Sequence, residues 1–112
     1  MQNFSPEALQ QVADYFQTLS EPTRLQILNL LRTGEHNVGE LAEACQCSSA
    51  NVSRHLSMLT RQGLVKREGR GNTVFYSISD SSVYELCDLV CGNIARNIQR
   101  ANTGKKLFTK FR

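Results

Sequence analysis

Apolar residues recur at helical spacing early in the chain, in two stretches that each begin with a helix start signal. Ser5 precedes a proline at the first helical position, and residues 20–23, Ser-Glu-Pro-Thr, repeat that signal. Gly34 then ends the second stretch. Two helices are therefore predicted. Their apolar stripes are Leu9, Val12, Tyr15, Phe16 and Leu19 in the first helix, and Leu25, Leu28 and Leu30 or Leu31 in the second.

Two further amphipathic segments follow each other closely in the middle of the chain. Asn37 can cap the first, because Glu40 stands three positions later, which is the spacing of a capping box. A serine at position 48 or 49 can cap the second, a helix over residues 49–61 that Gly63 ends. The apolar face of this helix consists of Val52, Leu56 and Leu59. Two helices so close together predict a helix-turn-helix.

The remaining pattern predicts a β-hairpin and a fifth helix. Two β-branched and aromatic runs, residues 64–67 and 73–78, flank a glycine-rich turn at residues 68–72. Asp80 and the two serines after it can cap the last helix, whose apolar stripe continues to about Ile98. We therefore expect a mainly α winged helix-turn-helix (α+β) with five helices and a two-stranded hairpin wing. It should occupy residues 1–100, followed by a basic tail at residues 101–112.

Composition favours one soluble domain. The chain has 112 residues, of which 40% are hydrophobic and 21% charged, as in ordinary globular proteins. No basic leader runs into an apolar segment, and no stretch approaches the roughly 18 apolar residues of a membrane span. We therefore expect a cytoplasmic protein with no membrane partner, in which the four cysteines are thiols rather than a disulfide framework.

The distribution of charge indicates a polyanionic partner more clearly than its total does. The formal net charge is only +3. No Asp or Glu occurs from Ala44 to Arg67 or from Gly92 to the end, whereas acidic residues gather in the early part of the chain. Nucleic acid would therefore be attracted to the middle and to the tail.

The helix at residues 49–61 is the predicted DNA-reading element, because the second helix of a helix-turn-helix enters the major groove. With the apolar face turned inward, an acid-free face points outward. Its first residues have donors and acceptors for base edges, and the hairpin cations can reach phosphates or the minor groove. The predicted DNA-binding residues are Ser49, Ala50, Ser53, Arg54, Ser57, Arg61, Lys66, Arg67 and Arg70.

Other functions compete with this interpretation. The same face could be a solvated helix surface, and the domain could be a protein-interaction module that does not touch DNA. An enzyme is not expected, because the sequence has no phosphate-binding glycine loop and no nucleophile and base at suitable spacing.

His55 lies between the inner and outer faces, so a structural role and a DNA contact both stay open. His36, next to a turn, is expected to be exposed.

Several motifs together resemble the ArsR/SmtB family of winged-helix repressors. They are LSEPTRLQIL at 19–28, GELA at 39–42, NVSRHL at 51–56, GLV at 63–65 and VFYSI at 74–78. The resemblance implies a homodimer in which the first and last helices form the interface. It also implies a repressor that binds a palindromic double-stranded operator and releases it when an inducer binds. The family's reading helix maps onto Ser49, Ala50, Ser53 and Arg54.

The family's known inducer sites are not matched. Asn37 and Gly39 stand where arsenic sensors have two cysteines, and Asn29 stands where persulfide sensors have one. Zinc sensors place Asp, His, His and Glu on the last helix, where this chain has Asp80, Ser82, Asn93 and Arg96. The resemblance therefore does not identify the inducer.

Cys87 and Cys91 are the main candidate inducer ligands. Four positions apart on one helix, their Cβ atoms would lie about 6 Å apart, so both thiolates could bind one soft ion such as trivalent arsenic or a zinc-like metal. They could instead be packing residues or redox- or persulfide-responsive thiols. Cys45 is expected in the core and Cys47 exposed and open to oxidation; as ligands they are weaker candidates.

Overall fold

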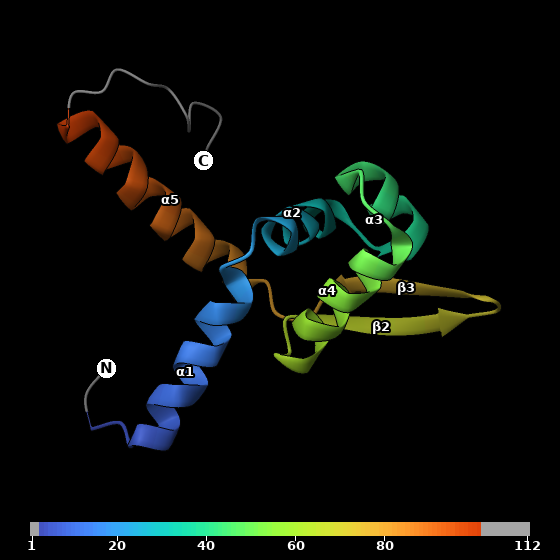
Figure 1. Ribbon diagram of the computed structural model, residues 1–112, viewed down its shortest axis with the longest axis horizontal. Coiled ribbons are helices and arrows are strands. Elements are labelled where there is room, and N and C mark those ends of the chain that lie inside the picture. The colour runs from blue at the N-terminus through green and yellow to red at the C-terminus, as the bar shows by residue number, and fades with distance from the viewer. Residues whose placement is uncertain (1–2, 102–112) are drawn as a thin grey trace. The chain divides into compact units, whose positions relative to one another are not determined.

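The computed structural model describes residues 3–101, which form helices and one small sheet (Figure 1). The helices are α1 (Pro6–Leu19), α2 (Pro22–Leu30), the 3-10 turn η1 (Leu31–Thr33), α3 (Val38–Cys45), α4 (Ser49–Arg61) and α5 (Ser82–Arg100). The strands are β1 (His36–Asn37), β2 (Val65–Arg70) and β3 (Thr73–Ile78). The chain divides into two compact units, the first ending at Ser79 and the second starting at Asp80. The predicted tail, residues 102–112, lies outside the described residues.

The first two helices begin where the sequence predicts, with one difference in capping. Ser5 caps α1, its hydroxyl accepting a hydrogen bond from the Ala8 amide at 3.1 Å. Ser20 does not cap α2 as its position suggests; its hydroxyl donates back to the Gln17 carbonyl at 2.6 Å. Glu21 caps α2 instead, because its longer carboxylate accepts from the backbone amides of Thr23 and Arg24.

The core of the first unit is built from α2, α3, α4 and the strand after them. Val52, Leu56 and Leu59 are all fully buried, which confirms the predicted inner face of α4. In α2 the prediction is partly wrong, because Leu25 is 41% exposed whereas Ile27 is completely buried. The helix ends at Leu30 and tightens into η1, so its buried positions are Ile27, Leu28 and Leu31 rather than an even helical stripe.

Only the last turn of α1 is buried. Thr18 and Leu19 are buried, whereas in the predicted apolar stripe Val12 and Tyr15 are half-buried and Leu9 and Phe16 remain exposed. The exposed part of this stripe is an apolar surface that no described residue covers.

The helix-turn-helix has a well-defined turn. The capping box at the start of α3 is confirmed, since the Asn37 side chain accepts from the Glu40 amide and the Glu40 carboxylate accepts from the Asn37 amide. Gln46 ends α3 in the left-handed conformation, at φ 55°. Ser48 then caps α4, its hydroxyl accepting from the Asn51 amide at 3.0 Å. These local bonds fix the direction in which α4 leaves α3.

The predicted two-stranded hairpin wing is confirmed as β2 and β3, and a third strand that was not predicted, β1, joins it in an antiparallel sheet with the order β1-β3-β2. β2 runs to Arg70, further than expected, whereas β3 has the predicted bounds, so only Gly71 and Asn72 remain in the turn, with Gly71 at φ 62°. β1 pairs His36 with Tyr76 and Asn37 with Phe75. The added strand attaches the base of the wing to the start of α3.

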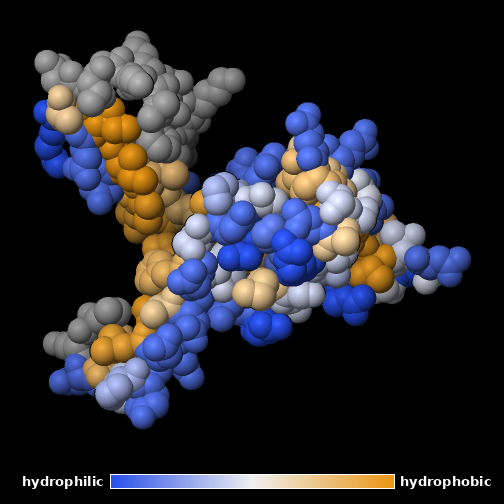
Figure 2. Space-filling view, viewed as in Figure 1, coloured by the Kyte–Doolittle hydropathy of each residue, from blue (hydrophilic) through white to orange (hydrophobic). Residues whose placement is uncertain are grey.

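The second unit contains α5. The Asp80 carboxylate accepts from the Ser82 amide at 3.0 Å, as the predicted start signal suggests, and the helix extends two residues beyond the predicted end at Ile98. Leu89, Val90 and Ile94 are exposed, and Figure 2 shows hydrophobic residues running along this helix. Among the described residues, no helix is long and apolar enough to cross a membrane.

Candidate nucleic-acid interface

The outer face of α4 is exposed along its whole length. Every predicted binding residue of the helix is exposed: Ser49, Ala50, Ser53, Arg54, Ser57 and Arg61. The helix contains no acidic residue, and its first turn follows the Ser48 cap. One Arg54 Nη donates to the Asn51 side-chain oxygen at 2.5 Å, and one Arg61 Nη donates to the sulfur of Met58 at 3.8 Å. Both guanidinium groups therefore keep most of their donors for an external acceptor.

His55 lies on the inner side of the same helix. It is 6% exposed, its Nδ1 lies 3.2 Å from Arg24 Nη1, and its Nε2 lies 3.9 Å from the Glu21 carboxylate. Arg24 also donates from Nε to the Thr18 carbonyl at 2.7 Å. His55 therefore connects α4 to the start of α2, which is a structural role. Sequence reasoning missed Glu21 and Arg24 as its partners.

Strand alternation divides the three cations of the wing between its two faces. Arg67 stands opposite Tyr76 in the register and shares a face with buried Val65, and it lines a hollow together with residues of α4. Lys66 and Arg70 lie on the opposite face. The structure thus groups Arg67 with the helix and separates the other two cations from it.

Arg70 already has partners within the protein. Its guanidinium donates to the Glu35 carboxylate, lies 3.9 Å from that of Glu68, and stacks 4.2 Å from the centre of the Phe75 ring. The hydrogen bond from Arg70 lowers the pKa of Glu35, and the same bond raises the pKa of Arg70. To contact DNA, this side chain would have to leave Glu35.

A hollow of about 400 Å³ lies between α4 and the hairpin. Its lining residues are Ser57, Thr60, Arg61, Arg67 and Tyr76. The sequence prediction included the two arginines and Ser57 but missed Thr60 and Tyr76. The two-residue turn at Gly71 and Asn72 places Tyr76 directly opposite Arg67, a pairing that the longer turn predicted at residues 68–72 did not indicate.

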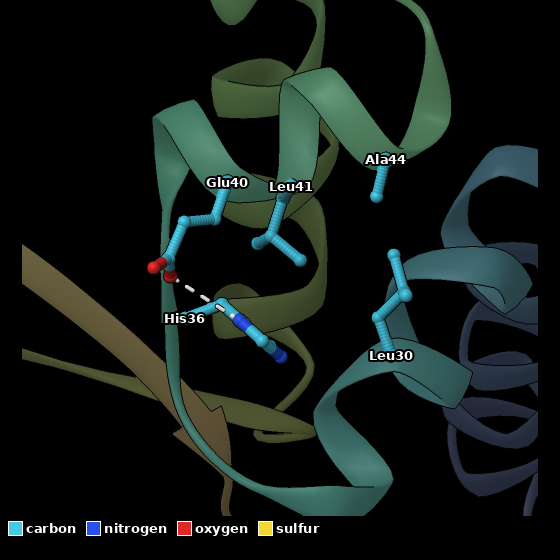
Figure 3. Close-up of a pocket in the computed structure, with 5 residues that line it drawn as sticks. All are labelled: Leu30, His36, Glu40, Leu41 and Ala44. Atoms are coloured by element: carbon cyan, nitrogen blue, oxygen red, sulfur yellow. Dashed lines mark hydrogen bonds and ion pairs between the residues drawn. The ribbon is translucent and has the colours of Figure 1, made fainter.

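A second, smaller hollow of about 160 Å³ lies between α2 and α3, away from this face (Figure 3). Leu30, Leu41 and Ala44 give it a mainly apolar lining, beside the ring of His36. His36 is half-buried in β1, with Nδ1 3.2 Å from the Glu40 carboxylate, so the expectation of a simply exposed histidine is wrong. The side chain is held there because its strand pairs with β3.

The cysteines are all partly accessible, and none of the four forms a disulfide. Cys45 and Cys47 are both half-buried, whereas the sequence suggested one buried and one exposed. Burial raises the pKa of Cys45, and neighbouring Cys47 adds to the effect, so this thiol is less readily ionised. Cys87 and Cys91 lie half-buried, four positions apart on α5. Within residues 3–101 no three His, Cys, Asp or Glu side chains gather into a possible metal site.

The sequence of this chain is similar to those of bacterial regulatory proteins. The family model described as bacterial regulatory protein, arsR family, matches residues 21–67, from the start of α2 into β2. A transcriptional repressor, the SmtB homolog of Synechocystis, is 38% identical over 82 residues, which span 73% of this chain and 62% of that repressor.

Two solved structures show the same fold over most of the chain. The crystal structure of Rv0081 from Mycobacterium tuberculosis has a TM-score of 0.79 and 32% identity, covering 89% of this chain and all of that one. A homodimeric winged helix-turn-helix DNA-binding domain, Mb0332 from Mycobacterium bovis, has a TM-score of 0.71 and 29% identity. This match covers 95% of the present chain and 99% of the other.

Proposed function

Since the chain belongs to the ArsR family of bacterial regulatory proteins, we propose that it is a cytoplasmic transcriptional repressor that binds DNA through α4. The observation that carries the proposal is the exposed, acid-free outer face of this helix, next to a wing with exposed cations. A face of this kind fits the major groove, where side-chain donors and acceptors meet base edges.

Each part of the face has a distinct role in this proposal. Ser49, Ala50, Ser53 and Arg54 lie at the groove-entering end of α4, where the small Ala50 permits close approach and Arg54 can bind a guanine edge. Ser57, Arg61 and Arg67 lie farther back and contact the phosphate backbone. Lys66 and Arg70, on the other face of the wing, are placed for an adjacent phosphate or the minor groove.

The repressor acts as a homodimer in this proposal, as the related Mb0332 domain does. Both α1 and α5 leave large apolar side chains exposed, which a partner subunit would cover. A two-fold dimer presents two α4 helices to a palindromic operator whose half-sites are about 34–36 Å apart.

The decisive experiment is DNA binding with a matched pair of variants. The operator is selected from random duplexes, and affinity is measured by fluorescence anisotropy at several salt concentrations. We expect Arg54→Ala to weaken binding by at least about tenfold and to reduce sequence preference, through loss of a base contact. Arg96→Ala, which removes the same charge from an exposed site on α5, serves as the control.

Either of two results contradicts the proposal. One is a wild-type protein that selects no sequence and shows no dependence on salt, as expected of a protein-interaction module. The other is an Arg54→Ala variant that binds as tightly as the Arg96→Ala control.

We further propose that the inducer acts through Cys87 and Cys91. Two thiols four positions apart on one helix suit a thiophilic ion such as arsenite, with further ligands supplied by the partner's copy of the pair. Binding would alter the helix pair at the interface and thereby the spacing of the two α4 helices.

Replacing both residues with serine should leave operator affinity intact and abolish release by arsenite or zinc. The matched control is Cys45→Ser with Cys47→Ser, which also removes two thiols. Release of the Cys87 and Cys91 variant by arsenite at the wild-type concentration would refute the metal hypothesis. Release of the wild type by peroxide or persulfide alone would favour a redox function of the same thiols.

A further inference from the structure

We propose that the hollow between α4 and the wing is a binding site for one phosphodiester of the DNA backbone, and that Tyr76 binds this group with Arg61 and Arg67. The inference rests on the proposed function, since it specifies how DNA is held. It adds to the predicted contact residues a tyrosine that the pattern of the chain did not indicate.

The first argument is charge. Arg61 reaches the hollow from the last turn of α4, and Arg67 reaches it from β2. Neither guanidinium forms an ion pair with a carboxylate in the part of the chain that the structure describes. No acidic residue lines the hollow. Two cations that converge without a counter-ion favour an anion between them.

The second argument is the available hydrogen-bond donors. Among residues 3–101, the Tyr76 hydroxyl and the Ser57 hydroxyl have no hydrogen-bond partner, and no unpartnered side-chain oxygen is buried. Both hydroxyls are therefore reached by solvent and can donate to a phosphate oxygen. Thr60 differs, because its hydroxyl already donates to the Leu56 carbonyl at 2.8 Å. Thr60 therefore lines the hollow without being assigned a contact.

The third argument is rigidity. Tyr76 pairs with Arg67 on one side and with His36 of β1 on the other, so it lies on the central strand of the sheet. Arg61 comes from a helix whose inner face is fully buried. A phosphate between them would contact two elements whose separation is set by the core. We therefore infer that this contact fixes the position of the DNA relative to both α4 and the wing.

The test combines a single-atom change in the protein with single-phosphate changes in the DNA. Tyr76→Phe removes only the hydroxyl, so we expect operator affinity to fall by about three- to tenfold with an unchanged salt slope. Arg67→Ala should also weaken binding and reduce the salt slope by about 1, because it removes a charge that contacts phosphate. Ser77→Ala is the matched control, since it removes a hydroxyl from the next residue, on the opposite face of β3.

Methylphosphonate substitution then identifies the phosphate. Each backbone position of the selected duplex is made neutral in turn, and binding of all four proteins is measured. We expect one position in each half-site at which the wild type and Ser77→Ala lose affinity, whereas Tyr76→Phe and Arg67→Ala lose much less. Thermal unfolding of each variant shows whether the fold is retained, and the Arg67 variant tests the site independently of the tyrosine.

The outcomes separate this proposal from the proposed function. If the wild type binds no DNA, the function itself is wrong. If the wild type binds and Arg54→Ala weakens binding, but Tyr76→Phe matches Ser77→Ala, only the phosphate site is refuted. Different sensitive phosphates for the two variants would refute it as well. If inorganic phosphate at constant ionic strength dissociates the wild-type complex but not that of Tyr76→Phe, the free anion competes with the DNA for the hollow, which supports its assignment as a phosphate site.

Discussion

Arg24 Nη1 lies 3.2 Å from His55 Nδ1, so residues 31 positions apart in the chain connect the start of α2 to the inner side of α4. The contact fixes the helix that carries the predicted reading face. It also explains why a polar residue is tolerated on a face otherwise built from Val52, Leu56 and Leu59, since a buried polar group requires a partner.

Replacing His55 with alanine should therefore destabilise the fold by about 2 kcal/mol, because it leaves a space in the core and removes a partner of Arg24. Urea denaturation followed by circular dichroism measures the change. His55→Gln, which keeps an acceptor, should lose less stability and retain operator affinity. A glutamine variant of normal stability that no longer binds DNA would instead show a direct DNA contact.

The ion pair between Glu35 and Arg70 should make stability depend on pH. The hydrogen bond from Arg70 holds the folded-state pKa of Glu35 below its ordinary value of 4.5. The pair therefore contributes stability that is complete above about pH 4.5 and is lost as the pH falls through the folded-state pKa. Glu35→Gln should show a smaller decrease of the unfolding midpoint between about pH 5 and pH 3. An acid transition identical to that of the wild type would show that the pair is unimportant.

The same substitution should strengthen DNA binding. Glu35→Gln releases Arg70 and removes a negative charge beside the wing, so we expect affinity to rise by about two- to fivefold at low salt. Glu85→Gln, which removes an equal charge from the first turn of α5, tests for a general effect of net charge. Equal gains in the two variants would contradict a specific role for Arg70.

The capping box at the start of α3 should contribute measurably to stability. The Asn37 side chain accepts from the Glu40 amide at 2.8 Å, so Asn37→Ala should cost about 1 kcal/mol in the free energy of unfolding. Asn37→Ser retains an acceptor at the cap and should lose much less. Thermal or chemical unfolding distinguishes the two variants, and equal losses would mean that the cap is not the cause.

The exposed apolar side chains of α5 should hold the proposed dimer together. Val90 and Ile94 lie four positions apart on one face, so glutamate at both positions should shift the protein from dimer to monomer in analytical ultracentrifugation. Operator affinity should fall by at least about tenfold, because a monomer binds only one half-site. Asn93→Glu adds charge to an exposed polar site on the same helix as a control. A double variant that remains dimeric would exclude this face from the interface.

Much of the fold could be predicted because its signals are local. The inner face of α4, its bounds and the Asn37 capping box depend on residues within one or two helical turns of each other. The wing was also predicted, but its third strand was not. β1 has only two residues, too few to show any periodicity, and it exists because it pairs with β3.

By itself, the order of residues determined which α-helices form, which side of α4 faces inward and which residues of α4 are exposed. The tertiary structure alone decided how the wing cations are divided, that Arg70 pairs with Glu35, and that Arg61, Arg67 and Tyr76 meet across one hollow. The reason is the range of the forces involved. Helical periodicity acts between neighbours in the chain, whereas these partners are brought together only when strands pair and α4 packs against the sheet.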